Sequence, residues 1–151
     1  MGPNAKVIPL GQMDGDAIRL VTARKVWIDH NTLYECQDGL LDVTRGSTDV
    51  TVSNNWFRNQ DKVMLLGHDD GYLRDKNMKV TVIFNHFGPN CNQRMPSMSP
   101  SIKSEANFFV APNDAGNKEQ TGVGGAKPNY DQEQYFKVEI AGLVKELTSE
   151  S

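Results

Sequence analysis

The chain has 151 residues, of which 38% are hydrophobic and 23% are charged, and its formal net charge is −3. This composition is typical of one globular domain and excludes global disorder and a collagen-like chain. The negative balance argues against nucleic acid as a partner. No apolar run approaches the roughly 20 residues that cross a bilayer, so we expect no membrane segment.

Residues 1–13 contain the breakers Pro3, Pro9 and Gly11 and are predicted to form a loop. The opening residues 1–6 lack the apolar core of a signal peptide, so we expect none within this chain. Cys36 and Cys91 are the two cysteines and lie 55 residues apart, which predicts neither a disulfide framework nor a zinc cluster.

From residue 14 onward the sequence repeats. Four eight-residue segments each begin with a β-branched residue, have asparagine in the sixth place and end on Leu or Phe; they are 26–33, 50–57, 80–87 and 102–109. Their asparagines are Asn31, Asn55, Asn85 and Asn107, at intervals of 24, 30 and 22 residues. Such intervals favour a solenoid with coils about 4.8 Å apart, an apolar interior and a ladder of asparagines at one corner. The alternative is a sandwich of short antiparallel strands with asparagines in the turns.

The charged residues follow the same phase. Asp42 lies eleven residues after Asn31, and the corresponding parts of the next two coils contain Lys62 and Arg94. Asp14 and Asp16 lie about one interval earlier. Asp38 and Asp42 could share an ion only if the chain bends between them, and Asp38-Gly39 is a turn dipeptide.

Four carboxylates near one lysine and one arginine suggest a hard cation with an anionic ligand. Calcium binds six to eight oxygen atoms, for which carboxylates are the usual protein ligands. The sequence contains no EF-hand pattern, so the site would be assembled from several coils.

Six ordered motifs carry a resemblance to a known family. They are Asp14-Gly-Asp-Ala-Ile, Val26-Trp-Ile-Asp-His-Asn, Asp38-Gly-Leu-Leu-Asp-Val-Thr-Arg-Gly-Ser, Lys62-Val-Met-Leu-Leu-Gly-His, Val80-Thr-Val-Ile-Phe-Asn-His-Phe and Gln93-Arg-Met-Pro. Over residues 14–112 the chain resembles the family 1 pectate lyases, in particular their plant-type and pollen-allergen branch. The resemblance implies an all-β, right-handed parallel β-helix, Ca²⁺ as cofactor, secretion, and cleavage of polygalacturonate by β-elimination.

The resemblance also implies roles for single residues. Asp16, Asp38 and Asp42 correspond to calcium ligands, with Asp14 in the acidic pair beside them. Lys62 corresponds to a substrate-binding lysine, and Arg94 to the arginine that removes the substrate proton. Because arginine ordinarily keeps its proton whereas lysine gives it up more readily, Lys62 is the alternative base.

The chain departs from the family pattern after the arginine motif. Ser99 stands where the family has a second arginine, and a coil is missing between Pro96 and Ser97, as are the coils before Asp14. We therefore expect impaired activity. The alternative is a non-catalytic β-helix fragment that binds acidic polysaccharide or is an allergen-like remnant. A pectin lyase acting on methylated substrate is a weaker alternative, since it would not need the carboxylates.

Three regions are predicted: a partial β-helix over residues 1–112, a Gly-rich polar linker over 113–128 and a helical segment over 129–151. The last contains apolar residues at helical spacing, namely Phe136, Ile140, Leu143 and Leu147. This C-terminal amphipathic helix could cap the solenoid or be loosely held. We expect a monomer.

Several conspicuous residues are better explained by structure than by chemistry. His30, His68 and His86 are expected to be packed or hydrogen-bonded, and Asp29 to make structural hydrogen bonds. Trp27 and the other aromatic residues of the repeats are predicted to belong to the core. The segments Asp69-Asp70 and Arg74-Asp75-Lys76 are predicted to form a solvated charged loop.

Overall fold

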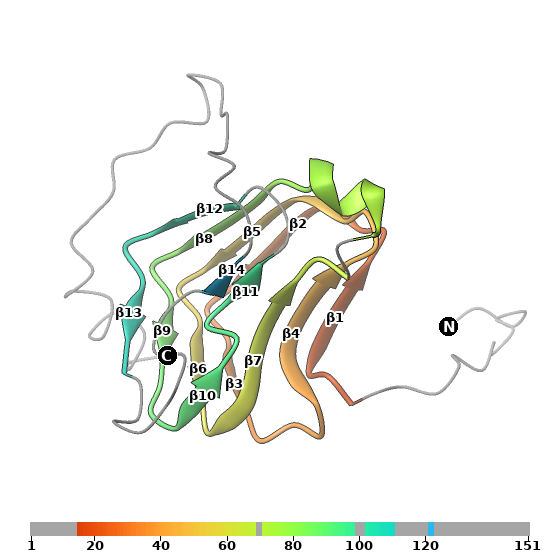
Figure 1. The fold of residues 1–151 in the computed structure, drawn as a ribbon. Helices are drawn as coiled ribbons and strands as arrows, with labels where there is room; N and C mark the ends of the chain where they lie inside the picture. The colour runs from red at the N-terminus through yellow and green to blue at the C-terminus, as the bar shows by residue number, and fades with distance from the viewer. Residues whose placement is uncertain (1–14, 69–70, 99–101, 111–120, 123–151) are drawn as a thin grey trace, which may run out of the picture.

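The computed structural model describes residues 15–68, 71–98, 102–110 and 121–122. Over these residues the chain winds into a parallel β-helix, in which successive coils add strands to the same three sheets (Figure 1). Every strand pair in the described residues is parallel. The predicted solenoid is thus confirmed, and the antiparallel sandwich is wrong.

Sheet A contains six strands: β1 (Ile18–Val21), β4 (Gly39–Thr44), β7 (Gln60–Leu66), β10 (Cys91–Gln93), β11 (Ser97–Met98) and β14 (Thr121–Gly122). Sheet B contains β2 (Arg24–Asp29), β5 (Thr48–Ser53), β8 (Val80–Ile83) and β12 (Ile102–Glu105). Sheet C contains β3 (Thr32–Tyr34), β6 (Trp56–Arg58), β9 (His86–Phe87) and β13 (Phe108–Phe109). One short 3-10 helix, η1 (Leu73–Asn77), lies between β7 and β8.

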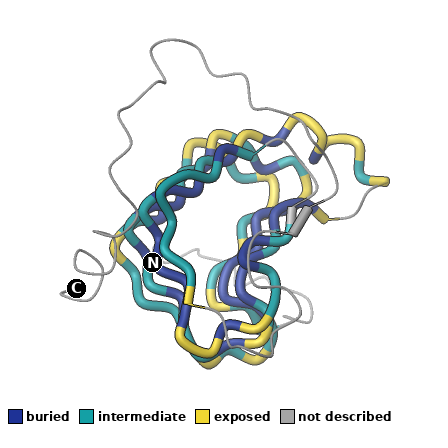
Figure 2. The backbone as a smooth tube through the Cα atoms, turned by 60° about the vertical axis from the view of Figure 1, so that its left-hand side comes forward, coloured by how far each residue is buried: buried dark blue, intermediate teal, exposed yellow. Residues whose placement is uncertain are grey.

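The interior is built from stacked apolar residues that occupy the same place in successive coils. On sheet B, Val50 pairs with Val80 and Val52 with Val82, and all four side chains are buried. On sheet C, the rings of Phe57, Phe87 and Phe109 stack with centroids 5.0 and 4.9 Å apart. Each fully buried valine or phenylalanine contributes about 1.5–3 kcal/mol. Figure 2 shows the coils following nearly the same outline, so this interior is continuous from coil to coil.

The predicted asparagine ladder is confirmed at the corner between sheets B and C. The side-chain amide of each ladder asparagine donates to the Oδ1 of the next: Asn31 to Asn55 at 3.0 Å, Asn55 to Asn85 at 3.0 Å, and Asn85 to Asn107 at 3.1 Å. Asn55 and Asn85 are fully buried. Because buried amides are costly unless they are hydrogen-bonded, this corner has one strongly preferred coil register.

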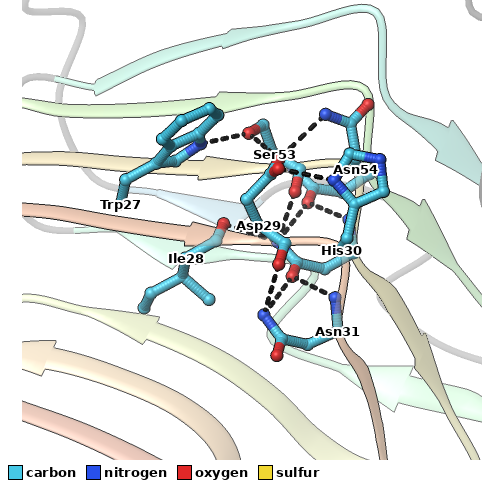
Figure 3. Close-up of polar contacts among 9 residues, drawn as sticks. Trp27, Ile28, Asp29, His30, Asn31, Ser53 and Asn54 are labelled. Atoms are coloured by element: carbon cyan, nitrogen blue, oxygen red, sulfur yellow. Dashed lines mark hydrogen bonds and ion pairs between the residues drawn. The ribbon is translucent and has the colours of Figure 1, made fainter.

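Trp27 does not belong to the core, contrary to the prediction. Val26 and Ile28 pack on the core cluster, and side chains alternate along a strand. Trp27 is therefore on the outer surface of β2 and is 69% exposed. Figure 3 shows Trp27 and Ile28 on opposite sides of the strand.

The segment around Asp75 also differs from the prediction of a solvated loop. Residues Leu73–Asn77 form η1, and Asp75 is only 2% exposed. Its two carboxylate oxygens accept hydrogen bonds from the backbone N–H groups of Gly46 and His68, at 2.5 and 2.6 Å. The carboxylate thus ties two coils together, which explains its burial. Asp69 and Asp70 lie outside the described residues.

The domain boundaries stay predictions. Within the range predicted as linker, Thr121–Gly122 form β14, which pairs with β11. The rest of residues 113–128 and the predicted C-terminal helix over 129–151 lie outside the described residues. In the part of the chain that the structure describes, no helix has the length and apolar character needed to cross a membrane.

Candidate functional site

The candidate residues gather where the strands of sheet A begin. Gly39 at the start of β4 pairs with Lys62 in β7, and Lys62 in turn pairs with Gln93 in β10. Asp38 directly precedes Gly39, and Arg94 directly follows Gln93. Paired residues on neighbouring strands lie about 4.8 Å apart. We call the group formed by Asp16, Asp38, Asp42 and Lys62 the acidic end of sheet A.

Two of the carboxylates converge on Gly39. Asp16 Oδ1 accepts a 2.9 Å hydrogen bond from the backbone N–H of Gly39. A Cβ atom added at Gly39 would lie 2.9 Å from Asp16 Oδ1 and 3.1 Å from Asp42 Oδ1. Only glycine leaves these two carboxylates in place, although they come from different coils. Asp42 is 8% exposed and Asp16 is half-buried, so the carboxylate of Asp42 is the more shielded from water.

Asp38 faces the lysine of the next coil. Lys62 Nζ lies 2.7 Å from Asp38 Oδ1, and the two side chains are 39% and 30% exposed. The bend that carries Asp38 is held by the buried amide of Gln60. Its Oε1 accepts from the N–H of Cys36 at 2.8 Å, and its Nε2 donates to the carbonyl oxygens of Cys36 and Asp38.

The thiol of Cys36 reports the negative charge at this end. Its pKa is raised, first by burial and second by the negative charge of Asp16. A raised thiol pKa means that a further negative charge is disfavoured here. The smaller of the two causes, the charge of Asp16, shows that this carboxylate is felt at Cys36 in the next coil.

Arg94 lies at a β-bulge next to the acidic end. Gln93 pairs with Lys62 but Ser97 pairs with Leu65, so the coil with Arg94 has one more residue than β7 across this stretch. Arg94 has a left-handed backbone with φ of 58°, and its carbonyl accepts a 2.8 Å bond from Met64. Bulges often re-aim a side chain near active sites. This one places an arginine one strand away from Lys62.

The carboxylate donors are suited to a hard cation, but they do not form a complete cage in the described part of the chain. No group of three or more His, Cys, Asp or Glu side chains that could hold a metal ion is found among the described residues. Asp14, the fourth predicted ligand, lies outside them. Asp16 and Asp42 converge on Gly39, whereas Asp38 is engaged by Lys62.

A second polar cluster lies on the outer face of sheet B (Figure 3). Asp29 accepts from Ser53 Oγ at 2.5 Å and from Asn54 at 2.9 Å, and it contacts His30 Nδ1 at 2.5 Å. Hydrogen bonds outweigh the effect of burial and lower the pKa of Asp29. Ser53 donates to the carboxylate and accepts from Trp27 Nε1 at 2.7 Å, so its hydroxyl is part of a hydrogen-bonded network and is not paired with the histidine. The predicted structural role of Asp29 is confirmed.

The comparison with protein families decides the family. The model described as pectate lyase matches residues 6–120. The chain belongs to the pectate lyase family. Similar curated relatives are pectate lyase 1 of Juniperus virginiana and of Cryptomeria japonica. Each is 50% identical over 139 residues, which is 76% of this chain but only 38% and 37% of those proteins. The chain thus spans little more than a third of the length of these pectate lyases.

The solved structures agree with this fold. The crystal structure of jun a 1, the major allergen from cedar pollen, is 37% identical with a TM-score of 0.72, and the match covers 91% of this chain and 56% of that one. A Bacillus subtilis pectate lyase variant, at 16% identity and a TM-score of 0.62, supports the fold alone.

The alignment with the Juniperus virginiana pectate lyase contains an internal length difference. It extends over 139 residues but uses 76% of this chain, about 115 residues. About 24 residues of that relative therefore have no counterpart here, which is close to the 23-residue step from Leu41 to Met64. The difference is thus about the length of one coil; that this coil is missing between Pro96 and Ser97 stays a prediction.

Sequence reasoning identified the charged residues but not what positions them. The sequence did not predict the contacts of Gly39 with two carboxylates or the hydrogen bonds by which Gln60 holds the bend at Asp38. Gly39 was noticed only as a turn residue, whereas its role is to leave space for two carboxylates. Gln60 gives no signal in the sequence, because its partners are backbone groups of another coil.

Proposed function

We propose that this pectate lyase family member binds Ca²⁺ and polygalacturonate at the acidic end of sheet A and cleaves the polymer by β-elimination. The observation that carries the proposal is the convergence of Asp16 and Asp42 on Gly39, beside the Lys62–Asp38 pair. Carboxylates for a cation and a lysine for an anion, one strand apart, are what a polymer of sugar acids requires. Like its relatives in the family, the protein would act outside the cell.

The proposed calcium ligands are Asp16, Asp38 and Asp42, with Asp14 beside them. Hard divalent cations prefer oxygen donors, and all four residues supply carboxylates. When bound, the ion would offset negative charge on the substrate carboxylate. Asp38 also holds the ammonium group of Lys62 at 2.7 Å, so it couples the cation ligands to the proposed substrate-binding lysine.

In the proposed reaction, Arg94 removes the proton on C5, which is α to the uronate carboxylate. The electron pair of the C5–H bond forms a C4–C5 double bond, and the C4–O4 bond breaks. The departing oxygen takes up a proton, so the products are a shortened chain and an unsaturated sugar end. Lys62 would bind the uronate carboxylate and stabilise charge that develops on it. Lys62 is the alternative base, because lysine releases its proton more readily than arginine.

We further propose that turnover is weaker than calcium binding. Asp16, Asp38 and Asp42 lie in the first two coils, before the place where about one coil is missing. The part of the substrate surface that lies beyond Arg94 would be shortened. Ser99, which lies outside the described residues, offers no guanidinium group for a uronate carboxylate.

The test compares the parent with Asp42→Ala and the matched control Asp49→Ala, which changes an exposed aspartate of β5. Calcium binding is measured by calorimetry, and turnover by the ultraviolet absorbance of unsaturated product from polygalacturonate. We expect Asp42→Ala to weaken calcium binding at least about 100-fold, since loss of outer-shell partners alone costs 10–100-fold. Asp49→Ala should match the parent. Equal calcium binding by all three proteins would contradict the metal assignment.

The second candidate function is calcium-dependent binding of acidic polysaccharide without cleavage. The observation that favours it is the length difference of about one coil from the Juniperus virginiana relative. Binding of oligogalacturonate that depends on Ca²⁺, without any unsaturated product, would support this function over catalysis. The lyase function would be supported by release of unsaturated product that depends on Ca²⁺. This release should be lost in Arg94→Ala but retained in Lys103→Ala.

A further inference from the structure

A hollow of about 390 Å³ lies at the corner between sheets A and B, and three arginines line it. Threonine and asparagine side chains complete the wall; the side chains concerned are Thr22, Arg24, Arg45, Thr48, Arg74 and Asn77. We call this hollow the arginine pocket. Arg45 directly follows β4, whereas Asp38 directly precedes it. Along β4, Arg45 lies seven residues after Asp38 and three residues after Asp42, which corresponds to roughly 23 Å and roughly 10 Å of extended chain.

Each of the three arginines comes from a different coil. Arg24 begins β2 in the first coil, Arg45 follows β4 in the second, and Arg74 belongs to η1 in the third. The pairing of Arg24 with Thr48 fixes the first coil against the second. Stacking of the coils therefore brings together cations that are far apart in the sequence.

The third coil is attached to the second by contacts that do not use the guanidinium groups. The buried carboxylate of Asp75 accepts from the backbone of Gly46 and His68. The Cβ and Cδ atoms of Arg74 lie only 3.4 and 3.5 Å from where a Cβ on Gly46 would be. Gly46 has φ of +80°, a backbone conformation that favours glycine, and the stem of Arg74 packs against it. Asp75 thus fixes η1, the helix that contains Arg74, against the second coil.

The three guanidinium groups of the pocket have no paired carboxylate within the described structure; the carboxylate of Asp75 beside the pocket is hydrogen-bonded to backbone N–H groups instead. Among the described residues, no carboxylate forms an ion pair with Arg24, Arg45 or Arg74. Arg45 Nη2 contacts His68 Nε2 at 3.5 Å. Three like charges around one hollow repel each other, and a bound anion would relieve that repulsion. In a chain of net charge −3, such a concentration of positive charge is local.

We propose that the arginine pocket is a second ligand site, which takes an anionic saccharide: a sugar that carries a carboxylate or a phosphate. Guanidinium groups bind both oxyanions in a bidentate manner. The hollow falls in the size range of small-molecule sites, far above the volume of a bare oxyanion. The hydroxyls of Thr22 and Thr48 and the amide of Asn77 can bind sugar hydroxyls. The proposal does not depend on the lyase activity, because no residue of the acidic end takes part in it.

The experiment follows the Nε–H signals of the arginines by NMR in the presence of EDTA, which removes any contribution from calcium. The probes are galacturonate, galactose 1-phosphate, galactose and inorganic phosphate. Either or both sugar anions should saturate, which also identifies the anionic group, whereas galactose and inorganic phosphate should bind at least about 10-fold more weakly. Equal binding of inorganic phosphate and the sugar anions would overturn the saccharide assignment, and so would equal binding of galactose.

Two variants and a matched control locate the site. Arg74→Ala and Arg24→Ala should each weaken binding of the sugar anion by at least about 10-fold, the effect of one lost charged hydrogen bond. Lys76→Ala removes an exposed cation from the same 3-10 helix but does not line the pocket, so binding should be unchanged. Circular dichroism checks that the variants are folded. An unchanged affinity in both folded arginine variants, or equal losses in Lys76→Ala, would refute the proposal.

Discussion

The two ends of strand β4 have surroundings of opposite charge. At the beginning of β4, carboxylates from two coils converge on Gly39, and directly after its end Arg45 joins two other arginines around a hollow. The acidic end is held by hydrogen bonds to the backbone, through Asp16 and Gln60. The arginine pocket is held by a carboxylate beside it, Asp75. In a solenoid, residues at the same place in successive coils lie side by side at one corner. The charges of these residues together therefore decide the chemistry of that corner.

The difference also concerns how tightly each end is fixed. Asp42 is 8% exposed and Gly39 is buried between the coils, whereas the three arginines are exposed and carry long, flexible stems. The carboxylates around Gly39 are therefore held more firmly than the three arginines. The arginine pocket can adapt to a larger ligand, at the expense of ordering its side chains upon binding.

The largest expected effect comes from a change that damages both ends together. Asn55→Ala removes a buried ladder amide that donates to Ile28, Ser53 and Asn85 and accepts from Asn31. Several buried groups lose their partners, so we expect a loss of about 2–4 kcal/mol in the free energy of unfolding. Urea denaturation measures it. Asn92→Ala, at an exposed position of β10, should cost less than about 0.5 kcal/mol; comparable losses in the two variants would show that the ladder is not a special source of stability.

A change of intermediate effect, Gly39→Ala, should weaken binding at the acidic end only. Gly39→Ala places a Cβ at 2.9 and 3.1 Å from carboxylate oxygens of Asp16 and Asp42, so those side chains must move apart. We expect calcium affinity to fall by about 10–100-fold, as for other changes in how ligands are held. Calorimetry with Ca²⁺ gives the affinity, and the binding of galacturonate at the arginine pocket in EDTA is the internal control. Equal losses of calcium affinity and of galacturonate affinity would mean that the acidic end and the arginine pocket are not independent.

The smallest effect lies outside both ends, at Asp29 on sheet B. The pKa of Asp29 is lowered because hydrogen bonds outweigh the effect of burial. Its contribution to stability is therefore present above the ordinary aspartate pKa of 3.8 and is lost as pH falls through the lower folded value. Asp29→Asn should flatten this acid dependence by less than about 1 kcal/mol and leave both sites intact. Unfolding curves between about pH 6 and pH 2 test this, with Asp49→Asn as control; an unaltered acid dependence in Asp29→Asn would contradict the role of the cluster.

The sequence predicted the coils well because their signal is repeated four times. Asparagines at regular intervals and β-branched residues on either side defined the strands of sheets B and C, as Val50 and Val80 illustrate. Trp27 was misplaced because its hydrophobicity was given more weight than the alternation of side chains between Val26 and Ile28. Alternation would have placed it on the outer face.

The sites were predictable only in part, because their geometry depends on contacts between coils. Asp16 and Lys62 were found from motifs, yet the sequence does not say that Asp38 would bind Lys62. The arginine pocket had no signal, since Arg24, Arg45 and Arg74 lie 21 and 29 residues apart and share no motif. Asp75 was predicted to be solvated because it stands among charged neighbours, whereas its backbone partners decide its burial.

The asparagine ladder has a direction. Every rung runs from the amide nitrogen of an earlier residue to the oxygen of a later one, from Asn31 through to Asn107. The amide dipoles consequently add up along the axis instead of cancelling. A coil from another protein could be inserted into this β-helix only if its asparagine amide pointed in the same direction. The ladder therefore defines a direction that any inserted repeat must match.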